Sequence, residues 1–189
     1  MTGIGNQRHC EASLRLEVDR ALRSRMPLSV LMADVDKLKF VNDAHGHGCG
    51  DRALALVAEV LRDTCRSRDV AARFGGDELA LPLPRTRVSK AKVVAQRIRT
   101  ELARRRELLG APLASLVFVS VVVDLEAVPT VGRLSDAATA DLLFESADRA
   151  LYTAKSRGGD RVEVIEVPCI SGVIRLDEHR AARKGRVSA

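Results

Sequence analysis

Three acidic residues in this sequence have the types and the spacing of a metal-dependent phosphoryl-transfer site. Asp34 comes near the end of a short apolar run, and Asp77 and Glu78 follow a pair of glycines. Clustered carboxylates repel one another unless a cation joins them, and their hard oxygen atoms suit Mg²⁺, or Mn²⁺ in its place. Ions bound there could activate a hydroxyl group and neutralise a phosphoryl group during transfer. This chemistry requires that Asp34 and Asp77 face a common cleft.

Two glycines precede the second pair of acids and admit two interpretations. Gly75 and Gly76 have no side chains, so a bulky ligand can approach their backbone closely. Gly-Gly-Asp is also an ordinary hairpin sequence, and acids at strand ends are often simply solvated, so this motif alone favours a structural role. Asp36 alternates away from the face that Asp34 occupies, and we expect it to be structural or solvent-facing.

Hydrophobic periodicity predicts the elements that must position these residues. The apolar run Leu28–Val35 fits a buried strand, and Val70–Phe74 and Glu78–Leu83 flank the glycines as a hairpin. The pattern predicts further helices at Glu11–Arg25, Leu54–Cys65, Ala91–Leu102 and Leu143–Ala154, and strands at Leu116–Val123 and Arg161–Val167. Because a hairpin interrupts the alternation of helices and strands, the predicted fold class is α/β with a mixed sheet.

Composition narrows the partners of the chain. Its 189 residues suit one domain, and only 3% of them are aromatic, which argues against a base-stacking surface for nucleic acid. The net charge of +6 favours a phosphate-rich ligand, nucleic acid or a membrane surface. None of the four cysteines forms a C-x-x-C pair, no apolar run could span a bilayer, and there is no signal-peptide pattern. We therefore expect a cytoplasmic domain with free thiols and no membrane insertion.

Five motifs resemble those of GGDEF domains and occur in the order of that family. They are Thr2–Arg8 (T-G-I-G-N-Q-R), Asp34–Asp43 (D-V-D-K-L-K-F-V-N-D), Gly46–Asp51 (G-H-G-C-G-D), Arg73–Leu79 (R-F-G-G-D-E-L) and Ala150–Lys155 (A-L-Y-T-A-K). Chance can produce one such motif but not the series. The chain is thus identified as a member of the GGDEF family, with a domain over residues 1–167 and a basic tail over 168–189 that we expect to be flexible.

The resemblance implies both a fold and a reaction. The implied fold is a five-stranded central sheet wrapped by helices, related to nucleotide cyclases and polymerase palms. The implied activity is that of a diguanylate cyclase, which condenses two GTP molecules into cyclic di-GMP and releases pyrophosphate twice. Two protomers, each holding one GTP, would face each other as a homodimer. Because the chain begins inside the family's opening motif, we also expect an upstream sensory module that this chain lacks.

The resemblance also implies roles for the acids. Asp34 and Asp77 would hold Mg²⁺, helped by the carbonyl of Val35. Glu78 would support this metal site or help to deprotonate the attacking hydroxyl. The expected catalytic residues are therefore Asp34, Asp77 and Glu78.

Other family positions imply contacts with GTP. Asn42 and Asp51 would read the guanine, whose Watson–Crick edge offers adjacent donors to a carboxylate that only accepts. Backbone amides of Leu38 and Lys39, at a predicted helix start, would cradle phosphates. Lys155 would supply charge to the terminal phosphate, although without the family it would be interpreted as a solvated lysine. The expected substrate-binding residues are Leu38, Lys39, Asn42, Asp51, Gly75, Gly76 and Lys155.

A second site is implied by the segment Arg66-Ser67-Arg68-Asp69. The product-inhibition site of the family is an R-x-x-D sequence that ends five residues before the glycine pair, and the spacing here matches. An arginine fork suits phosphate or the Hoogsteen edge of guanine. Arg66, Asp69 and Arg73 are therefore expected to bind cyclic di-GMP.

Four positions depart from the usual pattern of the family. Leu38 and Leu79 replace phenylalanines, which are apolar-for-apolar changes. Val122 stands where the family has glycine and could press on a neighbouring strand or on the nucleotide site, and Gly159 replaces an arginine that contacts phosphate. These two changes favour an alternative, a catalytically silent domain that acts as a cyclic di-GMP receptor.

A third hypothesis is a palm-like polymerase domain that makes other cyclic or linear oligonucleotides. This hypothesis rests on fold analogy alone, and Asp51 and the R-x-x-D segment argue against it.

Overall fold

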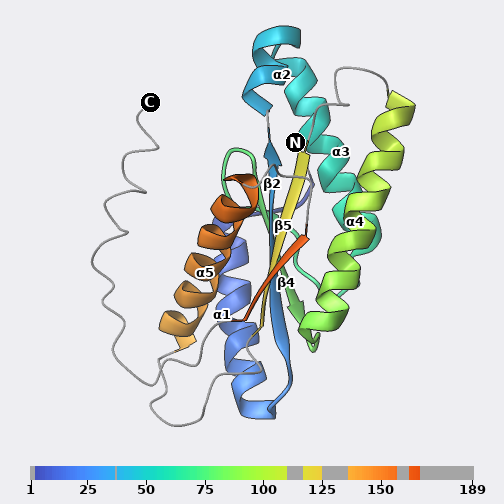
Figure 1. Ribbon diagram of the computed structural model, residues 1–189. Coiled ribbons are helices and arrows are strands. Elements are labelled where there is room, and N and C mark those ends of the chain that lie inside the picture. The colour runs from blue at the N-terminus through green and yellow to red at the C-terminus, as the bar shows by residue number, and fades with distance from the viewer. Residues whose placement is uncertain (1–2, 37, 110–116, 125–135, 157–161, 167–189) are drawn as a thin grey trace.

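The computed structural model describes residues 3–36, 38–109, 117–124, 136–156 and 162–166, which form one sheet with helices on both faces (Figure 1). In chain order, the elements are β1 (Gly5–Asn6), α1 (Gln7–Ser24), β2 (Leu28–Asp36), α2 (Leu38–His45), α3 (His47–Thr64), β3 (Ala72–Arg73), β4 (Glu78–Pro84), α4 (Val88–Leu109), β5 (Val117–Asp124), α5 (Asp136–Ser156) and β6 (Val162–Glu166). The strands are ordered β1-β3-β4-β2-β5-β6 across the sheet.

The sheet is mixed, so the predicted α/β class is confirmed. β2 pairs antiparallel with β4 on one side and with β5 on the other, whereas β5–β6 and β1–β3 are parallel pairs. The described residues form six strands rather than the five that the family resemblance implied. Two of the six, β1 and β3, are only two residues long, and β1 lies at the edge of the sheet. Short strands of this kind limit the unpaired backbone that an edge exposes.

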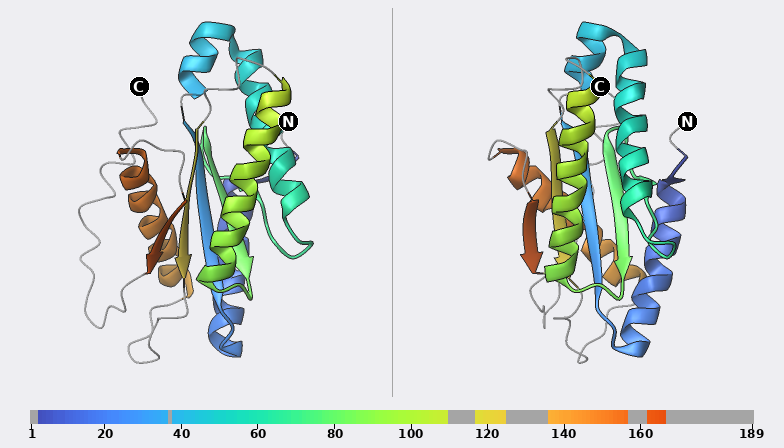
Figure 2. Two further views of the ribbon diagram at one scale, coloured as in Figure 1. Left: turned by 45° about the vertical axis from the view of Figure 1, so that its right-hand side comes forward. Right: turned by 90° about the vertical axis from the view of Figure 1, so that its right-hand side faces the viewer.

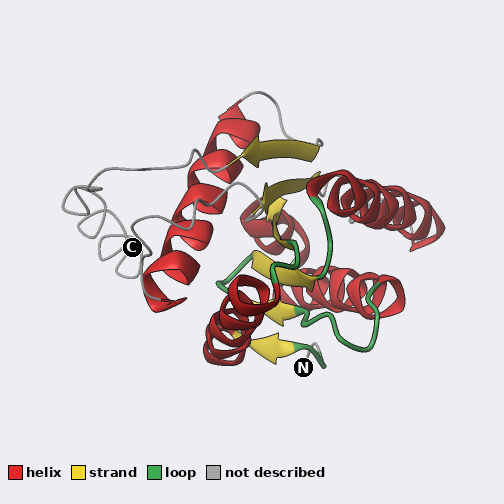
Figure 3. Cartoon of the chain, turned by 90° about the horizontal axis from the view of Figure 1, so that it is seen from below, coloured by secondary structure: helices red, strands yellow, loops and turns green. Residues whose placement is uncertain are grey.

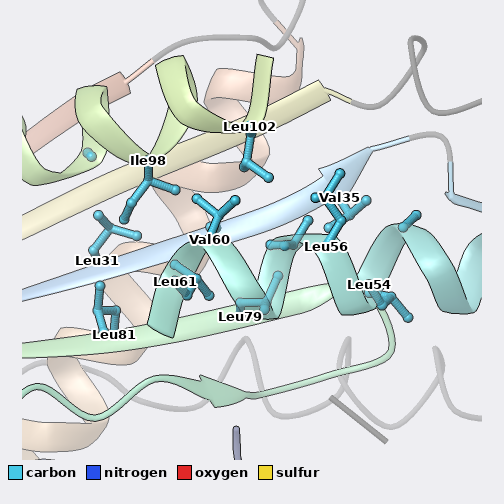
Figure 4. Close-up of a cluster of buried hydrophobic side chains, with 14 of the residues drawn as sticks. Leu31, Val35, Leu54, Leu56, Val60, Leu61, Leu79, Leu81, Ile98 and Leu102 are labelled. Carbon is cyan, nitrogen blue, oxygen red and sulfur yellow. The ribbon is translucent and has the colours of Figure 1, made fainter. Parts of the chain in front are cut away.

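Two layers of helices enclose the sheet. α1 and α5 cover one face and α3 and α4 the other (Figures 2 and 3). Alternation along β2 divides its side chains between these layers, because Val30 and Met32 are buried with α1 and α5, whereas Leu31 and Val35 are buried with α3 and α4. Figure 4 shows the cluster on the α3 and α4 side. Asp34 has the same parity as Val30 and Met32, so its side chain is directed to the α5 side.

α1 begins earlier than its hydrophobic periodicity predicted. It starts at Gln7 rather than Glu11, because the Asn6 side chain accepts a hydrogen bond from the His9 amide at 2.9 Å and caps the first turn. The first buried residue of this helix is Cys10, so the turn before it carries no apolar period. The cap leaves β1 beside β3, where the Gly5 amide donates to the Ala71 carbonyl at 3.0 Å.

The long helices are amphipathic rather than apolar throughout. In α4, the predicted stripe Ala91, Ala95, Ile98 and Leu102 is buried, while the opposite face carries charged residues. Among the residues that the structure describes, no helix combines the length and the apolar character needed to cross a membrane.

Candidate active site at the ends of strands β2 and β4

The last residues of β2 and the turn before β4 bring three acids together. Asp34 lies opposite Glu78 in the antiparallel ladder, and the Val35 amide donates to the Asp77 carbonyl at 3.0 Å. Directly opposed residues of an antiparallel pair share a face, so the side chains of Asp34 and Glu78 emerge on the same side of the sheet. In Figure 1 this end of β2 is the upper one, where α2 follows. The structure therefore gathers the acids that the sequence singled out.

Asp34 is the buried member of this group. Its side chain is 1% exposed, and its Oδ2 lies 2.6 Å from the Nζ atom of Lys155, in the last turn of α5. Its Oδ1 has no hydrogen-bond partner among the described residues. Burial raises the pKa of this carboxyl to about 6; the hydrogen bond from Lys155 opposes the rise, and repulsion by Asp77 and Glu78 adds to it. A cation at Oδ1 would therefore be stabilised.

The Gly75–Gly76 turn is closed by backbone hydrogen bonds to Glu78. The amides of Phe74 and Gly75 donate to the Glu78 carbonyl at 2.8 and 3.2 Å. The Glu78 carboxylate lies against Gly75, because a Cβ built there would be 2.8 Å from Glu78 Oε2. A Cβ at Gly76 would meet no described atom within 4 Å. Gly75 thus leaves room for the side chain of Glu78, whereas Gly76 faces open space.

The donor set fits a hard divalent cation. No group of three or more His, Cys, Asp or Glu side chains in the described ranges is arranged to hold a metal ion, so side chains alone do not complete a site. The carboxylates of Asp34 and Asp77 supply oxygen atoms, including the unpartnered Oδ1 of Asp34. The N–H and C=O of one strand residue lie on the same edge, so the Val35 carbonyl faces the turn as its amide does. These oxygen atoms suit Mg²⁺ or Mn²⁺, whose remaining ligands are commonly substrate phosphates and water.

α2 and α3 form a second group of polar residues beyond the end of β2. Asn42 Oδ1 is buried, and nothing in the described part of the chain donates a hydrogen bond to it. This atom packs directly on Gly50, where an added Cβ would collide with it. Asp51 follows Gly50 and is exposed. Gly50 therefore lets Asn42 pack against the turn of α3 that also carries Asp51, a role that its place in the G-H-x-x-G-D motif could have suggested and that the sequence reasoning missed.

The starts of these two helices differ in how well they could be predicted. α2 starts at Leu38, where a helix start was expected; Leu38 packs on the α3 and α4 cluster, and Lys39 is exposed. α3 starts at His47, although its periodicity begins only at Leu54. Glycines within this first part lower helix propensity by roughly 1 kcal/mol each. Packing against α2 overrides that preference.

The Arg66–Asp69 segment forms a small loop with a partly satisfied carboxylate. The Arg66 amide donates to Asp69 Oδ2 at 2.9 Å, and the Asp69 amide donates back to the Arg66 carbonyl at 3.0 Å. Asp69 Oδ1 is buried without a hydrogen-bond donor from the residues described. Arg73, which the resemblance grouped with these residues, has its guanidinium on the carbonyls of Gly75 and Gly76.

Comparison with known proteins assigns the family. The profile described as "Diguanylate cyclase, GGDEF domain" matches residues 1–161. The chain belongs to the GGDEF domain family. Its curated relatives include the "Probable diguanylate cyclase DgcC" of Escherichia coli (strain K12), which is 35% identical over 164 residues, covering 87% of this chain and 42% of the relative. "Diguanylate cyclase DgcP" of Pseudomonas aeruginosa is 34% identical over 165 residues, covering 87% of this chain and 23% of the relative. This GGDEF domain thus spans less than half the length of these relatives.

Solved GGDEF structures share its fold over most of their length. The GGDEF domain of DgcB from Caulobacter crescentus, in complex with c-di-GMP, has a TM-score of 0.73 and 27% identity, covering 86% of this chain and 92% of that chain. The "active GGEEF domain of a diguanylate cyclase from Vibrio cholerae" has a TM-score of 0.72 and 29% identity, covering 85% of this chain and 97% of that chain. These matches agree with the observed α/β architecture.

The departures of this GGDEF domain from its family lie at different distances from the acids. Leu79 is 2% exposed and packs in the α3 and α4 cluster, in agreement with an apolar replacement. Val122 pairs with Leu31, whereas Asp34 pairs with Val119, so Val122 is three residue pairs from the site, or about 10 Å along the strand. The backbone register therefore separates Val122 from the acids. Gly159 lies outside the described residues.

Proposed function

We propose that this GGDEF domain is a diguanylate cyclase that condenses two GTP molecules into cyclic di-GMP and releases pyrophosphate. The observation that carries the proposal is the register of β2 with β4, which joins Asp34 to Asp77 and Glu78 at one end of the sheet. The names of relatives that are 34–35% identical support the same reaction. The proposal includes a cytoplasmic location, since Cys10, Cys49 and Cys65 are free thiols that a reducing compartment preserves.

The acids would hold the metal and handle the proton. Asp34 and Asp77, with the carbonyl of Val35, would bind Mg²⁺ or Mn²⁺. When bound, such an ion lowers the pKa of the attacking hydroxyl and neutralises charge on the phosphoryl group. Glu78 lies against Gly75 beside Asp34, where its carboxylate would support the ion or accept the proton of the hydroxyl. The ammonium group of Lys155, which pairs with Asp34 in this structure, would pair with the terminal phosphate when GTP is bound.

Asn42 and Asp51 would read the guanine base. The Asp51 carboxylate would accept hydrogen bonds from the adjacent N–H groups of guanine, and Asn42 has a buried oxygen with an unmet hydrogen-bond requirement.

Two glycines of α3 offer a matched test of this guanine site. Gly50→Ala would displace Asn42, whereas a Cβ at Gly48 would meet nothing that the structure describes within 4 Å. We expect Gly50→Ala to raise KM for GTP by roughly tenfold or more and Gly48→Ala to leave it unchanged. Equal KM values for the two variants would contradict the guanine assignment.

The amides at the start of α2 would bind the phosphates. Leu38 and Lys39 occupy the first turn, where amides lack intrahelical partners and the helix dipole attracts anions. Gly76 would let the nucleotide approach the turn, because a Cβ added at this residue would meet no described atom within 4 Å. These contacts would hold GTP across the metal-binding acids.

The decisive test is incubation with GTP and Mg²⁺ at several protein concentrations, with chromatography of the products. Cyclic di-GMP that increases more steeply than protein concentration is expected, because two protomers must each bring one GTP. Omission of the metal should stop the reaction. Supplying ATP together with GTP separates this reaction from that of a palm-like polymerase, which would yield other oligonucleotides. An upstream module, expected from the family, would raise the local concentration of protomers.

A product-binding site at Arg66 and Asp69 is a further part of the proposal. Among the described residues, the Arg66 guanidinium makes no hydrogen bond or ion pair, and Asp69 Oδ1 lacks a donor, so both groups are available to a ligand. For each protein, we measure the concentration of cyclic di-GMP that halves its own uninhibited rate. Arg66→Ala should raise this concentration by at least tenfold. Unchanged inhibition would remove Arg66 from the site.

The second candidate function is a catalytically silent receptor for cyclic di-GMP. It is favoured by the preformed Arg66–Asp69 loop together with Gly159, which stands where the family has a phosphate-binding arginine. Binding of cyclic di-GMP without turnover of GTP would support this function. Magnesium-dependent synthesis of cyclic di-GMP would exclude it.

A further inference from the structure

Arg73 is bound to the turn that carries the acids. Its Nε atom donates to the Gly75 carbonyl at 3.2 Å and to the Gly76 carbonyl at 3.1 Å, and its Nη2 donates to the Gly76 carbonyl at 2.6 Å. These two carbonyls belong to the residues directly before Asp77. The guanidinium thus contacts the backbone of the turn that precedes the acids.

A glycine pair at this position needs such a contact. Gly75 and Gly76 have more backbone freedom than any other residue, and Gly76 is exposed, so side-chain packing does not order it. Backbone hydrogen bonds to the Glu78 carbonyl hold only the first part of the turn, through Phe74 and Gly75. The planar fork of Arg73 adds donors on the carbonyl side, and its geometry is fixed because the guanidinium is rigid.

The strand that carries Arg73 is itself fixed. Its neighbour Ala72 is fully buried and pairs with both Ala80 of β4 and Gly5 of β1. Arg73 pairs with Leu79, which is 2% exposed in the α3 and α4 cluster. The guanidinium is therefore anchored on rigid backbone, and the turn that it contacts is the adaptable partner.

We propose that Arg73 is a positioning residue that holds the Gly75–Gly76 turn so that Asp77 and Glu78 stay beside Asp34, and that it is not a ligand of cyclic di-GMP. The part that concerns turnover rests on the proposed cyclase function; the part that concerns the turn does not. Of the five N–H groups of Arg73, the Nε–H and one Nη2–H donate to the two carbonyls and are withdrawn from any ligand bound at the Arg66–Asp69 loop. A lysine at this position would keep the charge but lose the fork.

The test compares Arg73→Lys and Arg73→Gln with Arg97→Gln, which changes an exposed arginine of α4 that we assign to no site. Hydrogen exchange reports on the amides of Val35, Phe74 and Gly75, which bond across the turn. We expect both Arg73 variants to exchange these amides at least about tenfold faster while the rest of β2 is unchanged. We expect kcat to fall by roughly 10- to 100-fold with a small change in KM, because displaced acids act in the transition state. Arg97→Gln should change neither quantity.

Binding of cyclic di-GMP, measured by calorimetry, separates the two roles. The Arg73 variants should bind it within about twofold of the parent protein, whereas Arg66→Ala should lose binding. Arg73 variants with unchanged turn exchange would overturn the inference, as would variants that lose cyclic di-GMP binding while retaining turnover. If the parent protein made no product at all, the proposed cyclase would fail, but exchange and binding would still decide the role of Arg73.

Discussion

The end of β2 and the Gly75–Glu78 turn both carry acids to the same place, but they are built in opposite ways. Asp34 lies on a strand paired on both sides, and its side chain is 1% exposed. Asp77 and Glu78 follow two glycines in a turn that is only partly buried. The first acid is fixed by the sheet at the expense of desolvation, which raises its pKa to about 6. The other two are only partly buried and depend on local hydrogen bonds for their position. A rigid acid is therefore paired with adjustable ones.

Removing the acids should have the largest effect on turnover. Asp77→Ala and Asp34→Ala each delete a proposed metal ligand worth several kcal/mol in the transition state, so kcat should fall by roughly 10³-fold or more. Assays of GTP consumption with saturating Mg²⁺ measure this loss. The two variants should also differ in their free energy of unfolding, because Asp77→Ala changes a partly buried turn whereas Asp34→Ala leaves a space beside a buried strand. Turnover that survives Asp77→Ala would remove that residue from the metal site.

Asp34→Asn should stabilise the metal-free protein near neutral pH. The folded-state pKa of Asp34, about 6, lies above its ordinary value of 3.8, so protonation favours the folded state. The stability gained from this proton is complete below pH 3.8 and is lost as the pH rises through about 6. At pH 7 the asparagine variant should therefore be more stable by ~1–3 kcal/mol, and the difference should shrink as the pH falls to 4. Urea unfolding at several pH values, with a chelator present, measures this difference in the free energy of unfolding. A difference that is independent of pH would contradict a buried Asp34 carboxyl that is ionised at pH 7.

Lys155→Met should destabilise the metal-free protein. It leaves the buried Asp34 carboxylate without the ammonium group that lies 2.6 Å from it. Breaking a fully buried pair costs about 3–5 kcal/mol, but the Lys155 side chain is 33% exposed, so we expect a loss of ~1–2 kcal/mol. Thermal unfolding with and without Mn²⁺ tests the cause, since a cation at Asp34 should restore much of the loss. The same substitution combined with Asp34→Asn should have little further effect.

Two substitutions within the turn should give the smallest and most selective effects. Gly75→Ala places a Cβ against Glu78 Oε2 and displaces that carboxylate, so kcat should fall by roughly tenfold with little change in stability. Gly76→Ala meets no described atom within 4 Å and should alter only KM, through the approach of the nucleotide. Steady-state kinetics of both variants measure the split. If Gly75→Ala changed KM alone, the contact between Gly75 and Glu78 would have no catalytic role.

The strand ends that carry the acids could be predicted from the sequence because they are local, whereas the pairing of β2 with β4 joins distant parts of the chain. The apolar run before Asp34 and the hairpin around Gly75–Gly76 each predict a strand end, and an antiparallel pairing brings these ends together. The contacts of Lys155 with Asp34 and of Arg73 with the turn carbonyls were not predicted. The first depends on packing of α5 across the sheet, far along the chain. The second depends on which way a long side chain turns, and periodicity carries no information on that choice.

The two faces of the sheet set a length requirement for any ligand that uses the whole site. Asn42 and Asp51 belong to helices on the α3 side, whereas Lys155 belongs to α5 on the other side. A molecule that touches both groups must lie across the end of β2, from one face of the sheet to the other. Under the proposed function, the guanine base would lie on the α3 side of the sheet and the terminal phosphate on the α5 side, so the end of β2 would set the separation between them.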